Sequence, residues 1–240
     1  MDLIKIEFIK MKRSKILYFT MLGIIFVAGS VLFLGSMSRL EKRYFDKLGW
    51  LMEGTLSLSS FYVLPAIFSL IGGYIINREY EEDTLKNIIT IPVDINKLIF
   101  SKLIVAFAFS VIISFVLFIL VFIEEVALHI YEITMKFFLH NMILYILQSI
   151  GLYIAVTPII AIVVKFKKSY WISIIFAEIY SLLGMFAVST NFKNVHPIAA
   201  VFGFSTVYKK TSTDYIICCI SLIISLVIAY IILSFKDEKY

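Results

Sequence analysis

The sequence predicts an all-α integral membrane protein with six transmembrane helices, and composition and run length are the observations that predict it. Of its 240 residues, 61% are hydrophobic and 16% are charged, with a mean hydropathy of +0.96. Soluble domains are about 45–50% apolar and about 25% charged. Apolar runs of about 20 residues, the length that crosses the hydrocarbon core as a helix, recur along the chain. The predicted spans are residues 16–36, 55–77, 99–123, 141–164, 170–189 and 215–235.

The segment before the first span is strongly basic and predicts a short amphipathic helix on the membrane surface. Leu3, Ile4, Phe8 and Met11 share one side at helical spacing. Lysines on the other side would meet anionic lipid headgroups. A plain basic flank for the first span is the alternative. The apolar run that follows is longer than the core of a signal peptide and has no A-x-A-like cleavage site, so we expect it to be retained.

The distribution of Lys and Arg predicts the orientation of the six spans. With an even number of spans, both termini and the connection 78–98 share one side, which carries 14 of the 22 basic residues against 8 on the other. The positive-inside rule therefore places both termini in the cytoplasm. Because the basic residues flank apolar runs, the charge does not indicate nucleic-acid binding.

The remaining connections are short, so we expect one transmembrane domain over residues 1–240. Residues 37–54 and 124–140 are predicted to be polar connections outside the membrane. Pro65 lies in the second span, and the fourth span carries Gln148 and a predicted kink at Pro158.

One acid–histidine cluster lies near the end of the third span. Glutamates beside histidines can activate water, directly or through a metal, so Glu124, Glu125 and His140 define the hypothesis of an intramembrane hydrolase, with His129 in the same cluster. Solvated charges at the end of a span are the alternative. The sequence has no phosphate-binding loop of the G-x-x-x-x-G-K-[ST] type, no C-x-x-C pattern and no G-x-S-x-G motif.

A single carboxylate is predicted well inside a span, Glu178. An acidic residue there costs about 2.5–3.5 kcal/mol by insertion scales, and such residues usually face the bundle interior or a wet cavity. We therefore predict that Glu178 lines a translocation pathway, with a packing role as the alternative. An ion-coupled secondary transporter that uses Glu178 is a further functional hypothesis.

The connection 190–214 contains a stretch, residues 195–204, that is too apolar for water and too short to span. Such segments fit a re-entrant element, so His196 and Pro197 are candidates for an outer gate. A loop lying on the headgroups is the alternative.

The connection 78–98 is a charged island between two long apolar runs. Asp83 is placed to cap a short helix over residues 84–90, and Pro92 limits that helix. We expect this helix to lie parallel to the membrane and to present charges to a soluble partner; a solvated loop is the alternative.

The N-terminal segment 3–15 and the island together resemble ABC transporter permeases of the exporter class. These accompany bacitracin-resistance and lantibiotic-immunity systems and exporters of amphipathic peptide toxins. The family pattern in the island is matched by Arg78-Glu79-Tyr80-Glu81, by Thr84-Leu85, and by Pro92 and Lys97. The chain departs from the pattern at Asp83, where Gly is common.

The resemblance implies a permease that is not itself an enzyme and holds no cofactor, because ATP and Mg would bind to a separate ATPase subunit. Residues Arg78, Glu79, Tyr80, Glu81, Thr84, Leu85, Pro92 and Lys97 would form the ATPase-coupling element. The N-terminal helix would be an elbow on the inner leaflet of a bacterial plasma membrane. A second permease, identical or related, would complete the exporter of an amphipathic or antimicrobial peptide.

Overall fold

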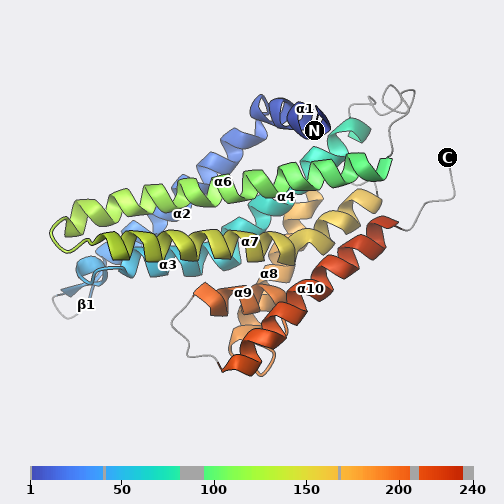
Figure 1. The fold of residues 1–240 in the computed structure, drawn as a ribbon. Helices are drawn as coiled ribbons and strands as arrows, with labels where there is room; N and C mark the ends of the chain where they lie inside the picture. Colours follow the sequence, from blue (N-terminus) through green and yellow to red (C-terminus); the bar gives the residue numbers. More distant parts are fainter. Residues whose placement is uncertain (1, 40–41, 82–94, 167–168, 206–210, 235–240) are drawn as a thin grey trace.

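The fold is a bundle of long helices, seen in a computed structural model that describes residues 2–39, 42–81, 95–166, 169–205 and 211–234 (Figure 1). The elements in order are α1 (Asp2–Lys12), α2 (Ile16–Ser36), β1 (Ser38–Arg39), β2 (Lys42–Arg43), a 3-10 turn (Tyr44–Asp46), α3 (Trp50–Leu58), a π-helix (Ser59–Val63), α4 (Leu64–Glu81), α6 (Ile95–His129), α7 (Met135–Lys165), α8 (Ile172–Val188), α9 (Pro197–Ser205) and α10 (Ser212–Ser234). The two short strands pair antiparallel, with Ser38 opposite Arg43.

Within the residues that the structure describes, five helical segments are long and apolar enough to cross a membrane, so the chain is a multi-pass membrane protein. They are Ile16–Ser36, Trp50–Arg78, Leu98–His129, Met135–Lys165 and Ser212–Ser234. The predicted fifth span corresponds to α8, an apolar helix of 17 residues. Its length of about 25 Å falls slightly short of a hydrocarbon core of about 30 Å.

The centre of the bundle is formed by the second span and α7. In the most apolar 18-residue stretch of each span, the buried share is 78% for Trp50–Arg78 and 67% for α7. The corresponding share for α10 is 22%. The helix α7 packs against α4, α6, α9 and α10, which explains its high burial. The outward residues of α10 are exposed aliphatic side chains, as expected for a helix that faces lipid.

The helix α1 lies against α6 and turns sharply into α2 at Arg13 and Ser14. Phe8 stacks on Phe109 of α6 with ring centroids 4.7 Å apart. Met11 of the expected apolar side is buried. Glu7 is also buried, and its Oε1 atom lies 2.8 Å from Nζ of Lys10. The helix α1 therefore buries a carboxylate that was not among the predicted apolar residues.

Two predicted connections are partly helical in the structure. The connection 124–140 is mostly helical, because α6 continues to His129 and α7 begins at Met135. Packing between the two helices sustains them beyond the apolar run, through contacts of Phe122 and Phe138 with ring centroids 4.9 Å apart. Thr134 caps α7 by accepting a hydrogen bond from the backbone N–H of Phe137.

The second span likewise begins earlier than predicted, at Trp50 instead of residue 55. The predicted connection 37–54 therefore ends in a helix, and its polar part consists of the strand pair and the 3-10 turn.

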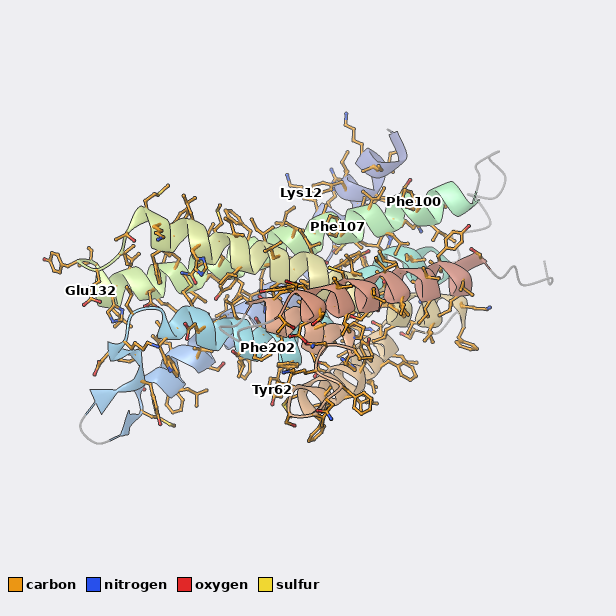
Figure 2. The ribbon with its side chains drawn as sticks, turned by 60° about the horizontal axis from the view of Figure 1, so that its bottom comes forward. Lys12, Tyr62, Phe100, Phe107, Glu132 and Phe202 are labelled. Atoms are coloured by element: carbon orange, nitrogen blue, oxygen red, sulfur yellow. The ribbon has the colours of Figure 1, made fainter. Side chains whose placement is uncertain are left out.

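The two ends of the bundle differ in what they carry (Figure 1). One end holds α1, the end of α4, the beginning of α6 and the end of α10. The opposite end holds the strand pair and the turn between α6 and α7. In Figure 2, Glu132 of that turn and Phe100 near the start of α6 lie toward opposite ends, with Tyr62 and Phe202 between them.

Candidate functional site: a break in the second span

The second span changes its helical geometry halfway along. Between α3 and α4, residues Ser59–Val63 form a π-helix, in which the backbone N–H of Leu64 donates to the carbonyl of Ser59, five residues earlier. Such wider turns are uncommon and are often found at functional sites. Pro65 follows at once and has no N–H to offer the preceding turn. The irregular backbone thus leaves carbonyl groups in the bundle interior that need donors from elsewhere.

The carbonyl of Phe61 is one of these groups, because it lies four residues before Pro65. The hydroxyl of Ser181, from α8, donates to it with an Oγ–O distance of 2.5 Å. Ser181 is fully buried. Within a membrane an unsatisfied backbone group costs several kcal/mol, so this contact ties α8 to the break.

The carbonyl of Leu56, one turn before the π-helix, accepts a hydrogen bond from the side chain of Gln148 of α7. The Nε2 atom of Gln148 lies 2.7 Å from this carbonyl and 2.6 Å from the hydroxyl oxygen of Ser60. Ser60 itself donates to the Leu56 carbonyl over 2.8 Å. One turn further out, the Tyr145 hydroxyl of α7 donates to the carbonyl of Met52. Side chains of α7 and α8 therefore hold both sides of the break.

Glu178 lies one turn before Ser181 on nearly the same side of α8, since residues three apart on a helix are neighbours. Met185, further along this side, contacts the Tyr62 hydroxyl of the π-helix, Sδ to Oη 3.0 Å. The Glu178 side chain is half-buried, and its Oε1 atom is buried without a hydrogen-bond partner in the described part of the chain. The predicted pathway carboxylate is thus placed on the side of α8 that faces the break.

The helix α9 lies against the same region. Its residues Ile198 to Val201 are buried, and Val201 packs on Gly151 near the middle of α7. Phe202 contacts Phe61 of the π-helix, with ring centroids 4.8 Å apart. Residues 197–205 therefore pack inside the bundle at the depth of the break.

The two gate candidates stand at the start of α9. Pro197 is its first residue, where a missing N–H costs nothing. The His196 ring lies over Gly184 of α8 and contacts the Tyr180 ring, with centroids 4.5 Å apart. Burial lowers the pKa of His196 to about 4, so the imidazole is neutral at pH 7.

The coupling residues lie at the other end of the second span. Arg78 places its guanidinium over the Tyr74 ring, 5.6 Å from the centroid. Glu79, Tyr80 and Glu81 complete α4, and Lys97 lies in the first turn of α6. Thr84, Leu85, Pro92 and the expected helix 84–90 lie outside the described residues.

Glu125, from the acid–histidine cluster, caps α3. Its Oε1 atom accepts a hydrogen bond from the backbone N–H of Gly49 over 2.6 Å and lies 3.2 Å from Nδ1 of His129. His140 is exposed on α7. In the ranges that the structure describes, no group of three His, Cys, Asp or Glu residues is placed to hold a metal ion. One of the two carboxylates that the hydrolase hypothesis needs, Glu125, is therefore engaged by a helix terminus.

The break in the second span has only a weak signature in the sequence, although Pro65 and Gln148 are visible as unusual residues in apolar runs. The three serines at 57, 59 and 60 are a further signal of a helix break. Ser181, which meets the Phe61 carbonyl, is 120 residues away and cannot be connected to it from spacing.

Comparisons with known proteins place the chain among transporters. Residues 3–184 match the model of a family described as "ABC-2 family transporter protein". The bacitracin transport permease protein BCRB of Bacillus licheniformis is 28% identical over 151 residues, which cover 61% of this chain and 72% of that protein.

Proposed function

Since the chain belongs to the ABC-2 family of transporter proteins and is a membrane permease subunit of an ABC transporter, we propose that it exports amphipathic peptides from a bacterial cell. In this proposal a separate subunit binds ATP and Mg and hydrolyses the nucleotide, so this chain holds no cofactor. Both termini are cytoplasmic, and a second permease, identical or related, completes the membrane part. The similarity to a bacitracin transport permease supports the choice of cargo.

The observation that carries the coupling proposal is the shared position of the two helix ends that flank the island. The end of α4, which carries Glu79 and Glu81, and the beginning of α6, which carries Lys97, lie at the same end of the bundle as α1 (Figure 1). A segment fixed at both ends by long buried helices can transmit a push from a soluble partner into the membrane. We propose that residues 78–97 dock on the ATPase and do so.

The break at Ser59–Val63 supports a mechanism for that transmission. Residues Leu64–Glu81 form one continuous helix from the break to the island, so a movement of the island moves this half of the span as a unit. The π-helix and Pro65 form the point at which the half-span can change its angle against α3. Glu178 and α9 lie beside this point and respond first.

The pathway and gate follow from the same geometry. Glu178 lines the route of the cargo, and α9 with His196 and Pro197 forms the re-entrant outer gate. The burial of α9 against α7 supports this role over a loop that rests on the headgroups. Binding of α1 to the inner leaflet as an elbow helix is supported by its exposed Lys5 and Lys12 and by the exposed Arg13 that follows.

The coupling role is tested by reversing the charge of Glu79 and Glu81 to Lys in the full transporter. We expect export and transport-stimulated ATP hydrolysis to be lost, together with co-purification of the ATPase. The matched control is Glu132→Lys, an exposed residue in the turn beyond the opposite end of α6 (Figure 2), which should change none of these. Normal assembly and export by the Glu79 and Glu81 variant would refute the docking role.

Ion-coupled transport is the second candidate, and the buried, unpartnered Oε1 atom of Glu178 in the described part of the chain is the observation that favours it. The test measures uptake of a fluorescent amphipathic peptide into inverted vesicles. We expect transport to require ATP and to fall in both Glu178→Gln and Glu178→Leu. Transport that is driven by a proton gradient without ATP would support the second candidate instead. Normal transport by both variants would mean that Glu178 serves only in packing.

A further inference from the structure

A pocket of about 410 Å³ lies between α7, α8 and α10, on the side of α8 away from the break. Tyr180 lines it and Glu178 does not; the two residues are about 160° apart around α8. The lining residues are Pro158, Ile159 and Ile162 of α7, Tyr180 of α8, Val195 and Pro197 at the start of α9, and Ile217, Ile220, Ser221, Ile224, Ser225 and Ile228 of α10. The pocket is therefore separate from the candidate site.

The floor of the pocket is formed where Pro158 interrupts α7. Pro158 cannot donate to the carbonyl of Ile154, and the hydroxyl of Thr157 donates to that carbonyl instead over 2.7 Å. The local backbone is thereby satisfied within α7 itself. The floor presents the ring of Pro158 and the side chain of Ile159, which is only 7% exposed.

The shape of the pocket is long and narrow along α10. Its lining residues on that helix run from Ile217 to Ile228, a rise of about 16 Å. The side chains along this length are mainly branched aliphatic groups. A chain-like apolar ligand fits such a surface better than a compact polar molecule does.

The polar atoms of the pocket are hydroxyl groups that already have partners. Ser221 donates to the carbonyl of Cys218 over 2.8 Å, and Ser225 donates to the carbonyl of Ser221 over 3.1 Å. The Tyr180 hydroxyl reaches Ser225. Among the described residues, those that line the pocket include no Asp, Glu, Lys or Arg. Nothing in the lining selects for a charged headgroup.

The mouth of the pocket lies on an exposed apolar surface. Ile223 and Val227, which neighbour the lining residues on α10, are about half exposed, as are Ile224 and Ile220 in the lining itself. Because α10 is long and apolar enough to cross a membrane and most of its surface is unburied, we expect bilayer hydrocarbon at this mouth. The bilayer offers acyl chains there at high local concentration.

We propose that this pocket holds one acyl chain of a bilayer phospholipid, with the headgroup outside. The chain fills the space between α8 and α10 over Pro158 and keeps α10 at a fixed separation from α8 and the start of α9. The inference does not depend on the transported cargo or on the ATPase.

The test is photolabelling of the purified full chain in lipid nanodiscs with a phosphatidylcholine that carries a diazirine in one acyl chain. We expect labelling of Ile159, which is buried, and of Tyr180, which is partly buried. This labelling should saturate and be competed by unlabelled phosphatidylcholine. Ile224→Trp, which fills the pocket, should reduce it at least fivefold, while Ile223→Trp, a matched change on the outward side of the same helix, should not.

Three outcomes overturn the proposal. The first is labelling confined to outward residues such as Ile223, equal in both variants, which means annular lipid alone. The second is competition by bacitracin, used as an amphipathic peptide probe, but not by unlabelled phospholipid. The third is unchanged labelling of Ile159 and Tyr180 in Ile224→Trp. If Ile224→Trp does not fold, as judged by its elution on size exclusion, Ile228→Trp replaces it in the same comparison.

Discussion

The hydrogen bond between Ser181 and the Phe61 carbonyl can be measured as a coupling energy, because Pro65 removes the backbone N–H that would donate to this carbonyl in a regular α-helix. Replacing Ser181, which is fully buried, with Ala removes the hydroxyl that donates to the Phe61 carbonyl. Hydrogen bonds between membrane helices average about 0.6 kcal/mol and reach about 1.7 kcal/mol. Loss of a partner to a buried carbonyl adds a cost of about 1–3 kcal/mol in soluble proteins. We expect Ser181→Ala to destabilise the chain by about 1–2 kcal/mol.

The second half of the cycle places the same change in a Pro65→Ala background. The alanine introduced by this substitution has an N–H four residues after Phe61, so it can donate to the carbonyl that Ser181 otherwise satisfies. In this background Ser181→Ala should cost about 1 kcal/mol less. Equilibrium unfolding of all four variants in mixed detergent micelles measures the difference.

A matched control for the cycle is Ser189→Ala. Ser189 is exposed, and its hydroxyl donates to the Phe186 carbonyl of its own helix. We expect its effect to be small and equal in both backgrounds. If Ser181→Ala costs the same with Pro65 present as in the Pro65→Ala background, the Phe61 carbonyl is not the group that Ser181 stabilises, and the account of the break is wrong.

Two further substitutions test the packing around the break by the same unfolding measurement. Glu125→Ala removes the cap of α3 at Gly49 and should cost about 1–2 kcal/mol, whereas Glu125→Gln keeps an acceptor oxygen and should cost less; equal losses would contradict the cap. Gly151→Ala places a methyl group 2.6 Å from Val201 and should cost about 1–3 kcal/mol, recovered in part by Val201→Ala. Gly29→Ala, which meets open space, should cause no loss, and a loss there as large as at Gly151 would remove close packing as the explanation.

Sequence alone predicts the elements whose signal is local. The first span is predicted at residues 16–36, the bounds of α2, because a long apolar run next to a basic flank has few alternatives. The short apolar stretch 195–204 corresponds closely to α9. In both cases the length and hydropathy of one segment suffice.

The elements that the sequence does not predict depend on contacts between distant segments. The polar residues of 124–140 indicate a connection, but α6 and α7 support each other as helices well past their apolar runs. The pattern around Glu125 indicates a solvated or catalytic acid, because the partner of its carboxylate, Gly49, is 76 residues away. The break in the second span has no periodic signature, since the partners of the Leu56 and Phe61 carbonyls come from α7 and α8.

The length of α6 and α7 has a consequence for the end of the bundle that carries the turn between them. At about 52 and 46 Å, both helices exceed the hydrocarbon core of about 30 Å even at a tilt of 40°. Their far ends therefore form a rigid stalk, with α3 anchored to it through Glu125. The turn at its tip exposes Tyr131 almost completely, at 99%. A small epitope inserted there would stand clear of the bilayer on a stiff support, and antibody access in intact cells would report directly which side of the membrane this end occupies.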